Sequence, residues 1–409
     1  MLAHRGAVVK GPQPISVRAC ATMLRCMVAT IAATLLIGNT SAADLSAVGG
    51  RKRLLEYGWD RPDAEFAKAH SAEMEQRPFD GVIFSLKSGG SLFRRAPFDA
   101  SAVAAEMEVL GSIQWKRFTD NFVVVHAAAD TGWDWFEDRD WAATETSVRL
   151  VARGVGRAKL RGVCFDPEPY GVNPWQYSLQ PSAHAHSFPE FAAKVRARGR
   201  ALMLTVQQEL PNPLWFTFFQ LSVLEDVVRL PAGKLATGLA DAQYGLLVPF
   251  LEGMLSAAEP GARIVDGDEW AYFAESGEEF LRRYHMIRAR ANALVAREVA
   301  ASYSAHVEVA QPVFLDQVMG LRDDAKKGVP ARVMTYPNRI RFLQQNVYWS
   351  LFTADQYAWL YSQNVDWWRK PVPRELDQAL QWVRDRVRND LPLGFEVGSA
   401  IRAARAQGH

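Results

Sequence analysis

Residues 160–170 read LRGVCFDPEPY, a short apolar run that ends in two acidic residues separated by a proline. A short apolar run bounded by glycine and proline predicts a buried strand, which here ends at Asp166. Pro167 and Pro169 each bias the preceding residue toward extended backbone. Because side chains two apart in an extended segment project the same way, Asp166 and Glu168 are predicted to face one side beyond the strand.

The same pattern of a short apolar run, a loop and a helix-period segment recurs along the chain. Pro62–Gln76 and Asp138–Val155 are two of the predicted helices. Eight alternating units predict an α/β fold, a (β/α)8 TIM barrel with extra helices before the last strand. A doubly wound open sheet is the alternative, but no Gly-x-Gly-x-x-Gly follows the first strand. The predicted strands are Leu54–Tyr57, Phe79–Leu86, Asn121–His126, Leu160–Asp166, Arg200–Gln207, Tyr244–Leu251, Ala262–Asp266 and Tyr357–Tyr361.

The N-terminal segment has the pattern of a secretory signal. Residues 1–43 contain four basic residues and no acid, and an apolar run from Met27 to Gly38 leads to small residues at Ala42 and Ala43. We therefore expect a signal peptide at 1–43, a single catalytic domain at 44–409, and export to the periplasm or the medium. No later segment is long and apolar enough for a membrane anchor, so none is expected.

Removing this segment changes the charge balance. Of the chain's 47 basic residues 43 remain against 45 acidic ones, a formal net charge of −2. This balance gives no basic field for nucleic acid, so no nucleic-acid partner is expected. All 13 tryptophans lie after residue 43, which makes aromatic content the prominent feature of the mature chain.

Two acidic clusters at predicted strand ends are the candidate catalytic groups, because the active face of such a barrel lies at the carboxyl ends of its strands. Asp166 ends the fourth predicted strand and Glu168 follows it, while Asp266 ends Ala262–Asp266, the seventh, and Glu269 follows it. Close carboxyl groups disfavour joint ionisation, and the resulting neutral acid suits protonation of a glycosidic oxygen. Glu168 is the expected general acid, with Glu269 or Asp266 as nucleophile or base. Alternatively, the acids cap the helices that follow.

Aromatic and polar residues beside the predicted strand ends are expected to contact a carbohydrate, since flat apolar rings with polar edges suit sugars. No cofactor is expected. The spacing of His184 and His186 is that of some metallohydrolases, but no supporting ligand set converges, so no metal site is expected. The predicted substrate-binding residues are Trp59, Trp133, Trp135, Tyr170, Trp175, Gln207, Glu252, Trp270, Tyr272 and Tyr361.

The segment 160–170 resembles the fourth-strand signature Asp-x-Asp-x-Glu of the chitinase-like glycoside hydrolases, with Cys164 at the first position. The resemblance implies that Asp166 assists an acetamido group and that Glu168 is the acid. The chain is also similar to a poorly characterised group of secreted barrel hydrolases, through segments such as 55–60 (LEYGWD), 77–81 (RPFDG) and 357–362 (YAWLYS). The placement of acids on predicted strands four and seven resembles the large retaining clan of barrel glycosidases.

The leading hypothesis is thus a secreted glycoside hydrolase that cleaves a poly- or oligosaccharide by carboxylate acid/base catalysis. A non-catalytic carbohydrate-binding barrel is the alternative. A metal-dependent hydrolase is a third hypothesis.

Overall fold

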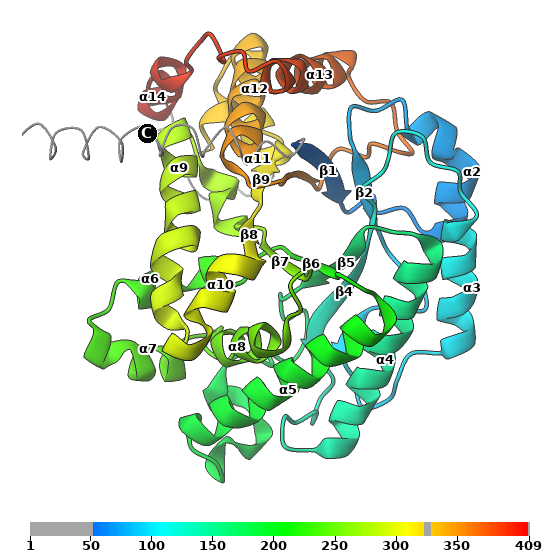
Figure 1. Ribbon diagram of the computed structural model, residues 1–409. Helices are drawn as coiled ribbons and strands as arrows, with labels where there is room; N and C mark the ends of the chain where they lie inside the picture. Colours follow the sequence, from blue (N-terminus) through cyan, green and yellow to red (C-terminus); the bar gives the residue numbers. More distant parts are fainter. Residues whose placement is uncertain (1–51, 323–328, 408–409) are drawn as a thin grey trace, which may run out of the picture. The chain divides into compact units, whose positions relative to one another are not determined.

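The computed structural model describes residues 52–322 and 329–407, and its named strands pair in parallel (Figure 1). The predicted signal peptide at 1–43 lies outside the described residues. The strands are β1 (Arg53–Gly58), β2 (Gly81–Phe84), β3 (Ser91–Phe93), β4 (Phe122–Ala129), β5 (Gly162–Asp166), β6 (Leu214–Thr217), β7 (Arg263–Asp266), β8 (Val307–Val309), β9 (Gln311–Phe314) and β10 (Tyr357–Ser362).

A divided strand closes the sheet into a barrel. The hydrogen-bonded order is β8-β7-β6-β5-β4-β2-β1-β10-β9, and β3 is an addition beside β4. β8 and β9 are successive in the chain and are separated by Ala310 alone. β8 pairs with β7 and β9 pairs with β10, so the two short strands are halves of one. Counted in this way, eight strands form a closed ring, which confirms the predicted (β/α)8 barrel.

The helices lie outside the strands and follow them in alternation (Figure 1). Among the residues that the structure describes, four α-helices stand between β7 and β10, which confirms the prediction of extra helices before the last strand. The helices are α2 (Ala64–Met74), α3 (Ala100–Gly111), α4 (Asp138–Ala158), α5 (Phe188–Glu209), α6 (Glu225–Val228), α7 (Leu235–Asp241), α8 (Leu247–Ala257), α9 (Gly277–His285), α10 (Ala300–His306), α11 (Leu315–Met319), α12 (Tyr336–Thr353), α13 (Arg374–Arg388) and α14 (Gly398–Gln407). A search of the described residues finds no helix with the length and hydropathy of a membrane span.

Two of the predicted strands are wrong. Arg200–Gln207 belongs to α5, and Tyr244–Leu251 runs into α8. A capping box at Ser187 starts α5, and its buried positions recur at helical spacing. Nearly every residue of α8 is buried, so its sequence has the continuous apolar pattern of an inner strand. The fifth barrel strand is instead β6, and Ala262–Asp266 is therefore the sixth.

Two glycines explain why α5 and α8 pack so closely. A Cβ atom at Gly199 would lie 2.1 Å from the Phe250 carbonyl oxygen, and one at Gly253 would lie 2.0 Å from the Arg196 carbonyl oxygen. The helix backbones therefore meet where neither has a side chain. A larger residue at either position would separate α5 from α8.

Candidate active site

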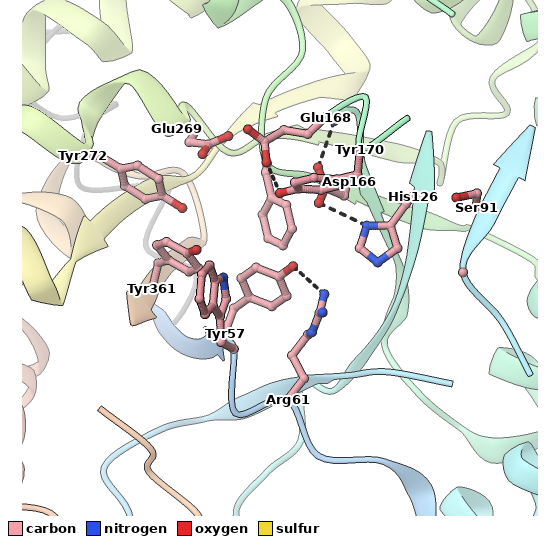
Figure 2. A pocket seen from close by; sticks show the side chains of 13 residues that line it. Tyr57, Arg61, Ser91, His126, Asp166, Glu168, Tyr170, Glu269, Tyr272 and Tyr361 are labelled. Atoms are coloured by element: carbon pink, nitrogen blue, oxygen red, sulfur yellow. Dashed lines mark hydrogen bonds and ion pairs between the residues drawn. The ribbon is translucent and has the colours of Figure 1, made fainter. Parts of the chain in front are cut away.

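A cavity of about 340 Å³ opens at the carboxyl ends of the barrel strands, where the active face of this fold lies (Figure 2). Its walls come from both ends of the described chain, since β1 and β10 are neighbours in the ring. The lining residues are Tyr57, Trp59, Arg61, Gly90, Ser91, His126, Asp166, Glu168, Tyr170, Phe218, Glu269, Tyr272 and Tyr361.

Asp166 and Glu168 both line this cavity, as their spacing predicts. Asp166 is buried at the end of β5, and its Oδ1 accepts a hydrogen bond of 2.9 Å from the backbone N–H of Glu168. Its Oδ2 lies 3.2 Å from Nδ1 of His126, which occupies the matching position on β4. Asp166 therefore fixes the loop that carries Glu168.

Glu269 enters the cavity from the turn after β7, and Figure 2 shows the Glu269 and Glu168 side chains pointing toward one another. Burial, together with the negative charges of Glu168 and Asp166, raises the pKa of Glu269 to about 9. Burial also raises the pKa of Glu168; the hydrogen bond from Tyr170 opposes this rise and the charge of Asp166 adds to it. Burial and their mutual repulsion therefore disfavour joint ionisation of the two facing carboxyl groups.

Aromatic rings form the other wall. The rings of Tyr272 and Tyr361 stack with centroids 5.4 Å apart and an interplanar angle of 15°, and Tyr57 stacks on Tyr361 at 5.8 Å. Phe218 packs against Tyr57 with centroids 4.3 Å apart. Because the rings stack on one another, their faces are largely covered, and they offer the cavity ring edges and phenolic hydroxyls that can hydrogen-bond a sugar.

A buried polar cluster holds the Glu269 turn in place. Asp266 is fully buried, and it accepts hydrogen bonds from the hydroxyl and the N–H of Ser222 at 2.5 and 2.9 Å. Asp268 has a left-handed backbone with φ of 50° and pairs with buried Arg283, whose Nε lies 2.8 Å from Oδ1. Asp266 therefore supports the turn and does not line the cavity.

Several predicted contact residues lie away from the cavity. Gln207 is in α5 and bonds the Ala257 carbonyl, while Glu252 is in α8 and pairs with Arg196. Trp270 is 52% exposed but does not line the cavity. The remaining three, Trp133, Trp135 and Trp175, are at most 1% exposed.

These buried tryptophans nevertheless support the site. Trp175 Nε1 donates to the Pro167 carbonyl at 2.8 Å, so it holds the residue between the two acids. Trp135 Nε1 donates to the Pro174 carbonyl at 2.8 Å and its ring packs on Trp175. Of the predicted residues, those that the structure brings together are Trp59, Asp166, Glu168, Tyr170, Glu269, Tyr272 and Tyr361.

Sequence reasoning missed five side chains of the cavity, namely Tyr57, Arg61, Ser91, His126 and Phe218. Tyr57 and His126 are the last residues of the predicted strands Leu54–Tyr57 and Asn121–His126, so the strand-end rule could have found them. Phe218 directly follows β6, which was not predicted. Ser91 starts the short β3, and Arg61 lies in the loop between β1 and α2.

A second acidic pair anchors the loop that carries Trp59 and Arg61. Asp60 accepts a 2.6 Å hydrogen bond from the backbone N–H of Trp367, and Glu56 on β1 accepts one of 3.2 Å from Trp368 Nε1. Burial raises the pKa of Asp60 to about 6. Burial, with the charge of Asp60, raises the pKa of Glu56 well above its usual range.

Glu56→Gln is expected to stabilise the protein at pH 8 and to have no such effect near pH 4. A carboxyl group whose folded-state pKa exceeds its unfolded value loses stability as pH rises between the two values, because the unfolded state releases its proton first. Glutamine has no proton to lose and its amide can donate to Asp60. Urea unfolding at both pH values measures this difference, and the exposed Glu65→Gln on α2 is the control. Equal effects at the two pH values would contradict it.

No protein-family model matches the sequence, and no curated protein matches it either. Among solved structures, the chain is similar to PbGH5A, a glycoside hydrolase family 5 enzyme from Prevotella bryantii B14. The match covers 83% of this chain and 97% of that chain, with 12% sequence identity and a TM-score of 0.41. Within residues 52–322 and 329–407, no cluster of three or more His, Cys, Asp or Glu side chains is arranged to hold a metal ion.

Proposed function

We propose that this protein is an exported glycoside hydrolase. The observation that carries the proposal is the pair of facing carboxyl groups, Glu168 and Glu269, in a cavity walled by tyrosine rings. Glycoside hydrolysis uses two carboxyl groups that flank the scissile bond, one to protonate the leaving oxygen and one to act at the anomeric carbon or on water. The signal-like pattern of residues 1–43 supports export.

Burial raises the pKa of both acids, but only Glu168 has a hydrogen-bond donor that opposes the rise. Tyr170 donates a hydrogen bond to Glu168, which stabilises its carboxylate form. The influences on Glu269 are burial and two negative charges, and each of them favours the protonated form. We therefore assign Glu269 as the general acid and Glu168 as the nucleophile or base, which exchanges the roles expected from the sequence.

In the proposed reaction a sugar ring lies beside the hydroxyls of the tyrosine wall with its glycosidic oxygen next to Glu269. Glu269 donates its proton to that oxygen as the bond to the anomeric carbon breaks. The Glu168 carboxylate either attacks that carbon or removes a proton from the attacking water. Asp166, held by His126, keeps Glu168 in position through its backbone N–H.

The proposal is tested by incubating the protein without residues 1–43 with a panel of polysaccharides and aryl glycosides and following product anomers by NMR. Turnover that is lost in both Glu168→Gln and Glu269→Gln supports the proposal. Retention or inversion at the anomeric carbon tells whether Glu168 is nucleophile or base. Binding of a glycan without any turnover would favour the non-catalytic carbohydrate-binding barrel instead.

Tyr170→Phe is expected to move the acidic limb of the pH profile of kcat/KM to higher pH. The variant loses the hydrogen bond that lowers the pKa of Glu168, so a higher pH is needed to ionise this group. The profile is measured on a substrate from the panel between pH 4 and about 10, with Tyr336→Phe, an exposed tyrosine of α12, as the control. An unchanged acidic limb would contradict the assignment of Glu168 as the ionised partner.

A further inference from the structure

Arg61 places a positively charged guanidinium group in the wall of the cavity. It follows β1 in the loop that Asp60 anchors, and among the cavity residues of the described chain it is the only arginine or lysine. Its Nη1 donates a 3.0 Å hydrogen bond to the Tyr57 hydroxyl, and its guanidinium lies 5.6 Å from the centre of the Tyr57 ring. Tyr57 thus fixes the direction of the side chain and engages one of its five N–H donors.

The other arginines near the site differ from Arg61 in having carboxylate or carbonyl acceptors. Arg283 pairs with Asp268 and Glu225, and Arg369 donates to the Asp60 carbonyl at 2.6 Å. Arg61, in contrast, forms no ion pair within the part of the chain that the structure describes, although three carboxyl groups line the same cavity. Its remaining donors therefore face the space that a substrate would occupy.

Two polar side chains share this side of the cavity with Arg61. His126 uses Nδ1 for Asp166, and Figure 2 shows its other ring nitrogen turned toward Arg61. Ser91, at the start of β3, adds a hydroxyl to the same wall. Figure 2 shows Glu269, Tyr272 and Tyr361 on the opposite side. The cavity is therefore asymmetric, with an aromatic side and a side rich in hydrogen-bond donors.

We propose that Arg61, with Ser91 and His126, binds the carboxylate of a uronic acid residue in the substrate, an inference that rests on the proposed glycoside hydrolase function. A planar guanidinium with free parallel donors matches a planar carboxylate in two hydrogen bonds, which a single hydroxyl of a neutral sugar does not provide. A sulfate ester on a sugar offers the same oxyanion chemistry, and the experiment below separates the two.

The test compares matched 4-nitrophenyl glycosides in both anomeric forms. Glucuronides and galacturonides are set against the corresponding glucosides, galactosides and 6-sulfated glycosides. The wild-type protein should prefer a uronide. Arg61→Gln should lower kcat/KM on that uronide by roughly 10–100-fold, the usual loss of hydrogen bonds to a charged group, and on its neutral partner by less than about threefold. Arg94→Gln, at an exposed site outside the cavity, controls for general charge effects.

Three results would overturn the inference. An equal loss on charged and neutral substrates would mean that Arg61 only supports Tyr57. If the wild-type protein prefers neutral glycosides, the proposed hydrolase function still holds but the proposed uronate site is wrong. A stronger preference for the sulfated glycoside that depends on Arg61 would mean that the site binds a sulfate ester and not a carboxylate.

A binding measurement separates failure of this inference from failure of the proposed function. Calorimetry compares free glucuronate and galacturonate with glucose, on the wild-type protein and on Arg61→Gln. Selective uronate binding that is lost in the variant supports the carboxylate site even where no glycoside is hydrolysed. If the wild-type protein shows neither uronide turnover nor uronate binding, the inference is wrong.

Discussion

Glu269→Gln is expected to lower kcat/KM by about 10²–10⁴-fold on a glycoside with a poor leaving group, and far less on its dinitrophenyl counterpart. The reason is that a general acid matters only where the departing oxygen needs a proton. Dinitrophenolate leaves without one. Glutamine keeps the size of the side chain but has no acidic proton, so the leaving-group dependence isolates the proton transfer.

Glu168→Gln provides the matched comparison. Loss of the nucleophile or base impairs attack whatever group departs, so the decrease should be similar on both substrates and again about 10²–10⁴-fold. Glu278→Gln, at an exposed position of α9, should leave both rates unchanged. If Glu168→Gln instead shows the leaving-group dependence, then Glu168 is the acid, as the sequence suggests, and the roles assigned from the structure are wrong.

Arg283→Met is expected to destabilise the protein by about 3–5 kcal/mol, the usual cost of leaving one buried charge without its partner. Arg283 is 4% exposed, and besides Asp268 it contacts Glu225 at 2.5 Å and the Ser222 carbonyl at 3.2 Å. Burial raises the pKa of Asp268 to about 7 even with Arg283 in place. Without the guanidinium that pKa rises further.

The pH dependence and a second variant identify the cause. Because a carboxyl group with a raised folded-state pKa loses stability with rising pH, the free-energy loss in Arg283→Met should be larger at pH 8 than at pH 5. Adding Asp268→Asn removes the unpaired charge, and asparagine tolerates the left-handed backbone at this position. The double variant should therefore recover part of the stability in urea unfolding. A loss that is independent of pH and unrelieved by Asp268→Asn would point to packing alone.

The barrel could be predicted because inner parallel strands are short apolar runs with turn residues at their ends. Two barrel strands were not predicted. β6 (Leu214–Thr217) is an apolar run after Pro213 and has the same form, so the rule could have found it. The other consists of the short β8 and β9, and β9 contains Pro312, which argues against a strand. Helices α5 and α8 were mistaken for strands because short apolar windows within them match both patterns.

The acids of the site could be predicted for a different reason. Asp166 ends a correctly predicted strand, Glu168 and Glu269 follow such strands closely, and the barrel rule places strand ends together. The pairing of His126 with Asp166 depends on the register between β4 and β5, which the sequence does not specify. The tryptophans also show what the sequence does not specify. A position after a strand does not tell whether a side chain faces the cavity or the core, and Trp135 and Trp175 face the core.

The pairing of β1 with β10, which closes the barrel, also determines when the protein can fold. β1 is hydrogen-bonded to β10 along all six of its residues, and Arg384 of α13 pairs with Asp80 before β2 at 2.5 Å. The first strand thus has a neighbour about 300 residues later in the chain, and closure waits until β10 has been synthesised. Until β10 is available, β1 has one unpaired edge, and at this stage the incomplete barrel can pair with another chain.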